Sequence, residues 1–475
     1  MGANDHATAV ASETDLAFEL AAFAGGLRFE HLALPVVEMV KADLFDTLAC
    51  AAAGSSAPGV GEVRSLAGEW GGTGQASVWV FGERLPAHHA AWVNGTMAHA
   101  RDYDDTHDAA VLHAGVSVIP AALAAAELRG SVSGADLIAA VAAGLETISR
   151  LGVATRIGII ESGYMYTSLL GHFGATLAAA RVLGLDRRQT ANALGIDYSM
   201  AAGNHQVTRD AALTKRMQPG FAAMSAVIAA QLAAKGVRGA QATFEGQDGF
   251  FRVYLRDQVD RVRVRDRLGE HYEFTQLSFK PYPCCRFDHT AIEAALRLRP
   301  ALAGRLDRIR AIRVGVNHQA YQAVCTPEEI RLAPRTIVQA QFSIPYTVAA
   351  ALIDGEVGLG HFTEQLAARA DIMALTRRVQ PRVDPEIERV FGRTISPAIV
   401  EIELDDGSVL SERVDRPLGH PDRPMSREDF NRKAADCFRA AAVPLDEGAL
   451  GRLRERVDRL EQLTDLGRLA RFQQA

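Results

Sequence analysis

The pattern of the sequence changes twice along the chain, and these changes constrain the fold more than any other feature. The first half is rich in alanine and reads as one helix after another, whereas strand-like segments begin near Tyr272. Helical patterns return after Ser426, which opens a capping box. A chain of 475 residues also needs at least two hydrophobic cores. The sequence therefore predicts a mainly α protein, in which residues 1–272 and 424–475 form a large all-helical domain and residues 273–423 form a smaller, inserted α+β domain.

The smaller domain is predicted from alternating apolar and polar residues, the pattern of half-buried strands. Ile309–Val316 alternates in this way, and so does the segment 400–404. Asp406-Gly407 then marks a tight hairpin turn into Val409–Val414. We also expect strands within 76–81 and 272–283, and helices near 14–27, 34–53, 85–101, 133–155, 220–235, 289–299, 341–354 and 361–379.

Composition and charge exclude several classes of protein. The net charge is −6 and no basic stripe is interleaved with aromatic residues, which argues against a nucleic-acid partner. No run of about eighteen apolar residues occurs, so no membrane span is expected. The N-terminal segment lacks the pattern of a secretory signal, and the cysteines have no zinc-ligand spacing. We therefore expect a reduced cytoplasmic protein, with free thiols at Cys50, Cys284, Cys285, Cys325 and Cys437.

Residues 94–113, between two alanine-rich helical segments, are dense in titratable groups. Three interpretations are open: a solvated turn, a metal site and a site of proton transfer. The spacing matches neither an EF-hand nor an H-E-x-x-H helix, which disfavours a metal. Burial would force the acids and imidazoles to pair or to shift their pKa values, as an acid–base site requires. The groups are Asp102, Asp104, Asp105, Asp108, His99, His107 and His113.

Two further segments supply cations. Lys215 and the arginine after it precede a Pro-Gly pair and a long helix, a pattern of either an anion-binding corner or a basic pair on the surface. Lys280 and Arg286 flank a proline-rich segment at the predicted domain boundary. Both can clamp carboxylates, Arg286 with a bidentate fork. A nucleophilic thiol at Cys284 or Cys285 is an alternative, but nothing in the sequence indicates that a neighbour activates it.

Together these segments resemble the MmgE/PrpD family over nearly the whole chain. The matches are, in order, Asn94-Gly95, His99, Asp102-Tyr-Asp-Asp-Thr106, His113, Thr214-Lys215-Arg216, Pro219-Gly220, Lys280-Pro-Tyr-Pro-Cys284 and the segment 342–346. The resemblance implies a large helical domain with an inserted α/β lid domain, a homodimer, and a site at the domain boundary that needs no cofactor or metal.

The resemblance also implies a reaction class. A proton moves, or a carbanion-like centre forms, at a carbon next to a carboxylate of a small di- or tricarboxylate. Dehydration of the 2-methylcitrate type is our first expectation, and epimerisation of the iminodisuccinate type is the second. A decarboxylase-like activity and an inactive member are the remaining alternatives.

One segment departs from the family pattern. The family has G-[FW]-H-P-T where this chain has Gly163-Tyr164-Met165-Tyr166-Thr167, so Met165 replaces a histidine. The loss of that imidazole argues against decarboxylation of cis-aconitate. Thr214 also stands where 2-methylcitrate dehydratases carry tryptophan. The natural substrate is therefore expected to differ from those of the type enzymes.

Roles follow for individual residues under this hypothesis. Asp102 and His113 are the acid–base candidates, and Thr106 is a hydrogen-bond donor beside them. Lys215 and Lys280 bind substrate carboxylates and stabilise developing negative charge. Further substrate contacts are expected from His99, Arg286, Tyr166 and Tyr321, with His99 orienting Asp102. The other acids of the stretch are expected to support these residues or to face solvent.

Overall fold

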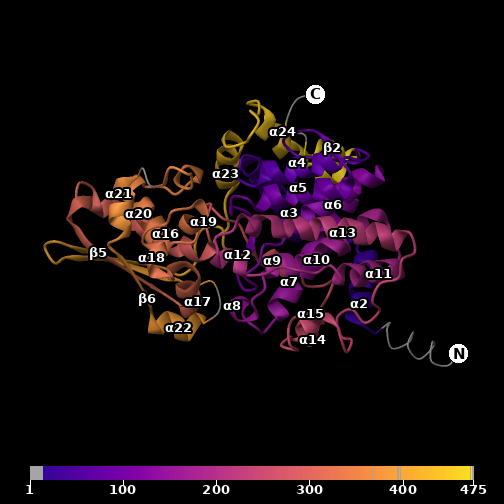
Figure 1. Cartoon of the computed structure of the whole chain (residues 1–475), viewed down its shortest axis with the longest axis horizontal. Coiled ribbons are helices and arrows are strands. Elements are labelled where there is room, and N and C mark those ends of the chain that lie inside the picture. Colours follow the sequence, from indigo (N-terminus) through magenta and orange to yellow (C-terminus); the bar gives the residue numbers. More distant parts are fainter. Residues whose placement is uncertain (1–13, 367–368, 393–394, 396, 471, 473–475) are drawn as a thin grey trace.

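The computed structural model describes residues 14–366, 369–392, 395, 397–470 and 472. Two parts, one helical and one α/β, lie side by side along the long axis of the molecule (Figure 1). Each part has its own hydrophobic cluster. The first draws on residues 16–277 and 434–472, and the second on residues 284–414. The prediction of a mainly α protein with a smaller α/β part is therefore confirmed.

Alanine-rich helices build the helical part. They are α2 (Leu16–Gly26), α3 (Leu34–Gly54), α4 (Val60–Trp70), α5 (Ala87–His99), α6 (Gly115–Arg129), α7 (Gly134–Ala154), α10 (Gly171–Leu183), α11 (Arg187–Tyr198) and α13 (Gln218–Ala234), with the short helices α8 (Ile159–Ser162), α9 (Tyr166–Leu169), α12 (Gln206–Arg209), α14 (Phe250–Val253) and α15 (Arg261–Arg265). Ser133 caps α7, and Asp186 forms the capping box of α11. α10 packs against α6, α7, α11 and α13, because its many small side chains let neighbouring helices approach closely.

The end of the described chain packs on the helical part. Ser426 forms the capping box of α23 (Arg427–Arg439), which packs on α3, and α24 (Ala449–Asp458) follows. Figure 1 shows these C-terminal helices beside the N-terminal ones. Lys433 of α23 is buried, and its Nζ lies 2.7 Å from Asp46 Oδ1 on α3. A buried ion pair thus joins the two ends of the chain.

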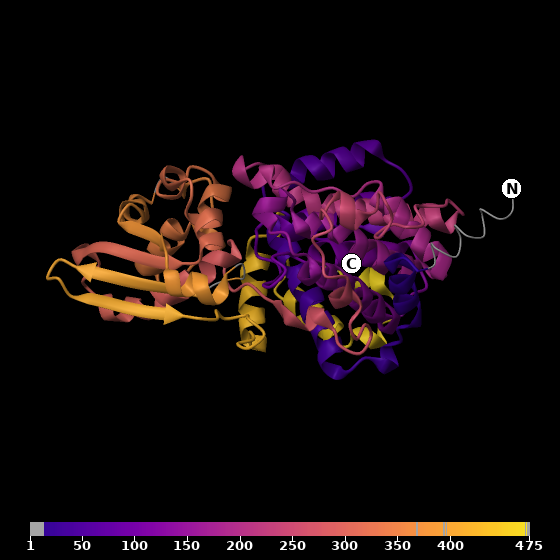
Figure 2. The same ribbon diagram turned by 90° about the horizontal axis from the view of Figure 1, so that it is seen from below.

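A four-stranded sheet organises the α/β part, and Figure 2 shows its strands side by side. Its order is β6 (Val379–Val383), β5 (Ile309–Val316), β7 (Ala398–Leu404) and β8 (Val409–Val414), with β5–β6 parallel and the other pairs antiparallel. The predicted β7–β8 hairpin is confirmed. α16 (His289–Leu298) and α20 (Ile344–Asp354) pack on the sheet. The remaining helices are α17 (His318–Ala320), α18 (Glu328–Arg331), α19 (Ile337–Gln341), α21 (Ala370–Thr376) and α22 (Pro385–Phe391).

Three element predictions were wrong in extent. The helix expected at 361–379 is only α21, and β6 begins where that segment ends. β6 contains Pro381, which an edge strand tolerates because one side of it has no ladder partner. The strand expected at 76–81 is only β1 (Ala76–Ser77), paired with β2 (Arg84–Leu85). The strand expected at 272–283 is only β4 (Leu277–Ser278), because the prolines that follow lack the N–H groups that a longer ladder needs.

Among the residues that the structure describes, two helical segments are long and apolar enough to cross a membrane, judged by length and composition. They are Gly134–Ala154 and Leu213–Ala234, and 94% and 61% of their apolar windows are buried inside the molecule. Core helices pass the same test, and α7 packs within the helical part on α6 and α10. The incomplete burial of the second segment leaves part of an apolar helix at the surface.

Candidate active site

The acidic stretch between α5 and α6 lies where the helical and α/β parts meet. α5 ends at His99, and Asp102 then takes a positive φ of 54°, which is strained for a residue other than glycine. β3 (Thr106–His107) pairs antiparallel with β4, and Thr106 stands opposite Ser278. This pairing brings Lys280, two residues beyond Ser278, against Asp102.

Asp102 is buried between two lysines from distant parts of the chain. Lys280 Nζ donates to Asp102 Oδ1 at 2.7 Å and to its carbonyl oxygen at 2.9 Å. Lys215 Nζ donates to Asp102 Oδ2 at 2.9 Å. Burial alone would raise the pKa of Asp102, but Lys215 and Lys280 outweigh it and hold this pKa well below its usual range. Asp102 is therefore a carboxylate, and the three groups together carry one net positive charge.

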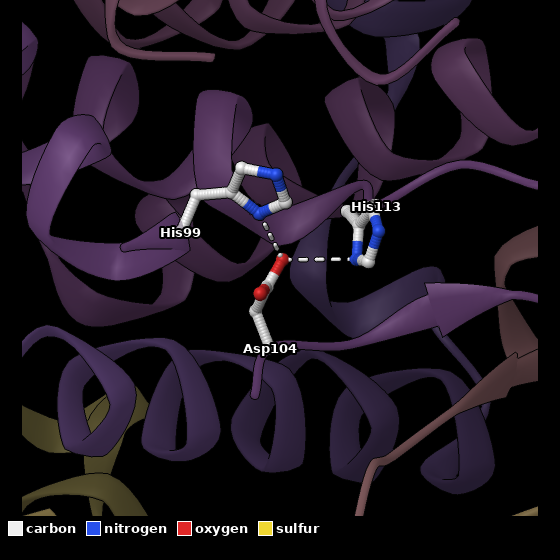
Figure 3. Close-up of side chains that lie close together, drawn as sticks. All are labelled: His99, Asp104 and His113. Atoms are coloured by element: carbon white, nitrogen blue, oxygen red, sulfur yellow. Dashed lines mark hydrogen bonds and ion pairs between the residues drawn. The ribbon is translucent and has the colours of Figure 1, made fainter. Parts of the chain in front are cut away.

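Asp104 joins two imidazoles (Figure 3). Its Oδ2 lies 2.9 Å from His99 Nδ1 and 3.0 Å from His113 Nδ1. Burial lowers the pKa of His99 to about 4, although Asp104 opposes this shift, so His99 is neutral near pH 7. Lys215 Nζ lies 3.2 Å from His99 Nε2 and donates to it. We therefore assign the ring proton of His99 to Nδ1, facing Asp104.

Asp105 occupies the N-terminal end of α6. Its carboxyl group accepts hydrogen bonds from the N–H groups of Ala114 at 2.8 Å and Gly115 at 3.1 Å. Burial, and then the charge of Asp104, raise the pKa of Asp105 to about 6 despite these bonds. The Asp105 carbonyl oxygen lies 2.6 Å from His113 Nδ1. His113 Nδ1–H therefore points at two acceptors, Asp104 and this carbonyl, which leaves Nε2 as the nitrogen available for chemistry.

A cavity of about 260 Å³ opens beside these groups. Both parts of the molecule contribute to its wall, and the lining has a polar and an apolar set. Besides the residues above, the polar set includes Thr167, His205, Thr208, Arg209, Gln319, Gln322 and Arg331. The apolar set includes Val111, Ile159, Ile160, Met165, Phe287 and Phe342. The cavity thus offers cations, an imidazole base and a hydrophobic wall to one small molecule.

The structure brings most of the predicted site residues together. Those that line the cavity are Asp102, Thr106, His113, Lys215, Lys280 and Arg286. His99 lies behind them and bonds Asp104, so its predicted contact with Asp102 runs through Lys215. Within the described part of the chain, Tyr166 and Tyr321 are not among the lining residues. The Tyr166 hydroxyl donates to the Ile157 carbonyl at 2.7 Å.

The side chains of Arg286 and Thr106, which also line the cavity, are engaged with protein partners as well. Arg286 forks onto Asp108, with Nε 3.1 Å from Oδ1 and Nη2 3.1 Å from Oδ2. Thr106 Oγ1 donates to the Leu112 carbonyl oxygen at 3.3 Å, so toward the cavity it offers an acceptor rather than the predicted donor. Arg286 can therefore bind a substrate carboxylate only if its guanidinium group contacts Asp108 and the substrate together, or if it breaks its ion pair with Asp108.

Sequence reasoning missed several residues of the site. His205 and Arg331 line the cavity, but each sits in a segment with no local pattern that marks it. Lys433 was also missed, although the sequence contains a signal that it is buried. It follows Phe430 by three residues on the apolar face of α23, where a lysine needs a buried partner. Its Nζ donates to the Tyr103 carbonyl at 2.6 Å, so α23 contacts the backbone of the acidic stretch.

Among the described residues, His99, Asp104 and His113 form a group that could hold a metal ion, with ligand atoms within 4.8 Å of one another. The same atoms already make hydrogen bonds of normal length, with the ring nitrogens acting as donors to one carboxylate oxygen. Lys215 also approaches from the other side of His99. This donor set fits a proton network better than a divalent cation, which would need both nitrogens deprotonated beside an ammonium group.

The fold and the site together define a class: a helical protein with an α/β part, whose shared cavity combines a carboxylate-supported imidazole with paired lysines. The chain belongs to the MmgE/PrpD family. Residues 18–262 match the model of the MmgE/PrpD N-terminal domain, and residues 282–451 match that of the C-terminal domain. The unmatched interval between them contains β4, which joins the two parts.

Named relatives of this chain are lyases. A cis-aconitate decarboxylase of Aspergillus terreus is 28% identical over 469 residues, which cover 94% of each chain. A cis-aconitate decarboxylase of Mus musculus is 27% identical over 465 residues, covering 95% of this chain and 92% of the relative. A 2-methylcitrate dehydratase of Cupriavidus necator is 28% identical over 278 residues, covering 56% of each chain.

Proposed function

We propose that this protein is a lyase that acts on a small tri- or dicarboxylate by proton transfer at a carbon next to a carboxylate. One observation carries the proposal: an Asp104-supported imidazole, His113, shares a cavity with the lysine pair around Asp102. Such a site binds anions and removes or returns a proton next to the bound carboxylate.

The lysines retain capacity for substrate. An ammonium group has three donors. Lys280 directs two contacts at Asp102, and Lys215 directs one at Asp102 and one at His99. Within the described residues, each lysine thus has one N–H left for a carboxylate oxygen of the substrate. Negative charge that develops as the proton leaves is stabilised by the same two groups.

His113 serves as the base in this proposal. Because its Nδ1–H is directed at Asp104 and the Asp105 carbonyl, Nε2 carries the lone pair. Nε2 takes the proton from carbon, and the resulting imidazolium is stabilised by the Asp104 carboxylate. In a dehydration, the bond from the neighbouring carbon to its hydroxyl then breaks, and the hydroxyl takes a proton and leaves as water.

Dehydration is our first assignment, because Met165 stands where the decarboxylase-like members carry a histidine. Decarboxylation is the second candidate, and the full-length similarity to two cis-aconitate decarboxylases favours it. In that reaction the carbon–carbon bond to the departing carboxylate breaks, and the carbanion takes a proton from the protonated base. The same residues serve both reactions, so products must decide between them.

The proposed function extends to the cofactor requirement, the role of the α/β part and the cellular location of the enzyme. The site's own residues supply the base and the positive charge, so we propose that it works without a resident cofactor or metal. The α/β part acts as a lid over the cavity to which it contributes. The free cysteines fit a reducing cytoplasm, which we propose as the location.

The test is a product assay in deuterated water. The purified chain is mixed with 2-methylcitrate, cis-aconitate and iminodisuccinate in turn, and products and deuterium incorporation are followed by NMR. We expect turnover of a tricarboxylate, unaffected by thorough chelation. His113→Ala and Lys280→Ala should each lower kcat/KM about 10²–10⁴-fold. The exposed residues His31 and Lys235 provide the matched controls His31→Ala and Lys235→Ala, and circular dichroism checks folding.

Three outcomes count against the proposal. Absence of turnover with every carboxylate would show that the substrate class is wrong. Full activity in both His113→Ala and Lys280→Ala would show that the site is wrong even if the protein is active. Loss of activity on chelation, restored by a divalent cation, would favour the metal alternative at His99, Asp104 and His113.

A further inference from the structure

His205 is a second imidazole that faces the cavity, on the segment just before α12. Its backbone N–H donates to the Gly163 carbonyl at 2.8 Å, which fixes its place beside the segment 163–167. Its Nδ1 is buried and has no hydrogen-bond partner within the described part of the chain. A buried ring nitrogen without a partner costs free energy, and it leaves Nε2 as the nitrogen of this cavity-lining ring that can reach a molecule bound there.

The neighbour of His205 is the position that departs from the family pattern. Met165 lines the same cavity, and its backbone N–H donates to the Gly203 carbonyl at 3.4 Å. Thr208, on α12, directs its hydroxyl at Met165 Sδ, 3.8 Å away. The segments that carry Met165 and His205 are therefore joined along their backbones. The segment of Met165 lacks the imidazole of the family pattern, and the adjoining segment carries one at His205.

We propose that His205 is a catalytic residue of this chain, the acid that protonates the leaving group while His113 acts as the base. The inference rests on the proposed function and names the proton donor that this function requires. It also explains how a chain with methionine at position 165 retains two imidazoles in its cavity.

The charges around His205 favour this role once substrate is bound. Burial lowers the pKa of His205 to about 4, and Arg209 and Lys215 add to the shift. A bound polycarboxylate brings negative charge that offsets Arg209 and Lys215, so it raises the pKa of His205. His205 therefore takes up a proton as the substrate binds, and it becomes a donor only in the complex.

The step balances as a dehydration. His113 Nε2 takes the proton from carbon, and the electron pair of that bond forms the double bond. The carbon–oxygen bond breaks with its pair on oxygen, and the proton of His205 completes a water molecule. His113 then releases its proton to solvent, and His205 takes up another when the next substrate binds.

Kinetics of single and double variants test the role. His205→Asn should lower kcat about 10²–10³-fold with a smaller change in KM, because the lost proton acts mainly in the transition state. The double variant Met165→His with His205→Asn should recover part of kcat, because it returns an imidazole to the adjoining segment. Gln206→Asn, at the exposed neighbouring position, is the control and should match the wild type.

Calorimetry supplies a readout that does not depend on turnover. Citrate binding is measured near pH 7 in buffers of different ionisation enthalpy, and the wild type should take up a fraction of a proton that His205→Asn does not. Equal uptake in both proteins, or wild-type kcat in His205→Asn, overturns the inference while leaving the proposed function intact. If the wild type neither binds citrate nor turns over any tricarboxylate, the proposed function fails and this inference fails with it.

Discussion

At the scale of single residues, the pKa values of neighbouring carboxyl groups in and behind the site are driven in opposite directions. Asp102 and Asp104 are buried, yet cations or imidazoles hold the pKa of each well below its usual range. Asp105 and Asp43 lie behind them, where burial and then carboxylate neighbours raise both pKa values. Groups whose environments separate their pKa values in this way divide the work of an acid–base site. Asp43 has no hydrogen-bond partner among the described residues, so no hydrogen-bond donor opposes the rise of its pKa caused by burial.

The raised pKa of Asp105 predicts a pH-dependent stability. Its pKa of about 6 lies above the unfolded value, so its contribution is complete below about pH 4 and is lost as the pH rises through about 6. The loss is on the order of 3 kcal/mol for two pKa units. Asp105→Asn removes the titration. The free energy of unfolding of this variant, relative to the wild type, should therefore rise between pH 4 and pH 7 in urea titrations.

Gln247→Asn, at an exposed position without an ionisable group, is the control for this prediction and should show a difference that is flat with pH. Asp105→Asn also changes the unfolding free energy by an amount that does not vary with pH. The N–H groups of Ala114 and Gly115 donate to different oxygens of the carboxyl group, and an amide has only one oxygen. A difference between Asp105→Asn and wild type that stays constant across this range would contradict the raised pKa.

At the scale of elements, close packing of α5 against α13 positions the site. A methyl group on Gly220 of α13 would lie 2.5 Å from the Trp92 carbonyl oxygen of α5 and 2.6 Å from Thr96 Oγ1. Only glycine permits this approach. The short 3₁₀ helix at Leu213–Met217 runs directly into α13 and carries Lys215. The distance between the two helices therefore sets the distance from Lys215 to Asp102.

Gly220→Ala should separate the two helices. We expect a loss of about 1–3 kcal/mol in unfolding free energy from overpacking, together with a lower kcat/KM because Lys215 moves away from Asp102. Gly68→Ala in α4 is the matched control. A methyl group there meets nothing within 4 Å, so stability should stay level or rise slightly. Equal unfolding midpoints for both variants would argue against the close approach of α5 and α13.

The elements that sequence could predict are those with local signals. Ser133 and Asp186 are N-cap residues that mark the starts of α7 and α11. The β7–β8 hairpin is predicted by alternating apolar and polar residues on both sides of Asp406-Gly407. β6 carries no such signal, because its parallel pairing with β5 depends on a partner more than sixty residues away. Val80, in the turn between β1 and β2, takes a positive φ that its residue type disfavours, so the local sequence does not signal this turn.

At the scale of the whole molecule, the site is an assembly of distant segments. Asp102, Lys215 and Lys280 were predicted to act together, and the family resemblance rather than any local pattern linked them. Their supports come from still further along the chain. Gln341 of the α/β part donates to the Arg101 carbonyl at 2.8 Å, and Lys433 of α23 donates to that of Tyr103. Such contacts between backbone and remote side chains leave no trace in sequence spacing, so the sequence could not predict them.

The surface of the helical part carries an apolar patch, and we propose that a second copy of this chain covers it. α13 is apolar around most of its circumference, and such a helix needs cover on every side. The patch comprises Leu66, Trp70, Leu213 and Phe221, exposed by 39%, 57%, 40% and 38%. Trp92 lies between the rings of Trp70 and Phe221, with centroids 5.6 Å away on each side. A rigid aromatic surface of this kind suits a two-fold interface, in which the same patch contributes from both subunits.

We therefore expect the protein to be a homodimer in solution, joined through this patch. The double variant Trp70→Asp with Phe221→Asp places carboxylates in the interface, and light scattering should show it as a monomer with unchanged circular dichroism. Val262→Asp is the matched control. Val262 is 76% exposed on α15, which lies at the opposite edge of the helical part from α4 (Figure 1), so that variant should remain dimeric. A monomeric wild type, or a dimer that survives both patch substitutions, would show that the patch has another role.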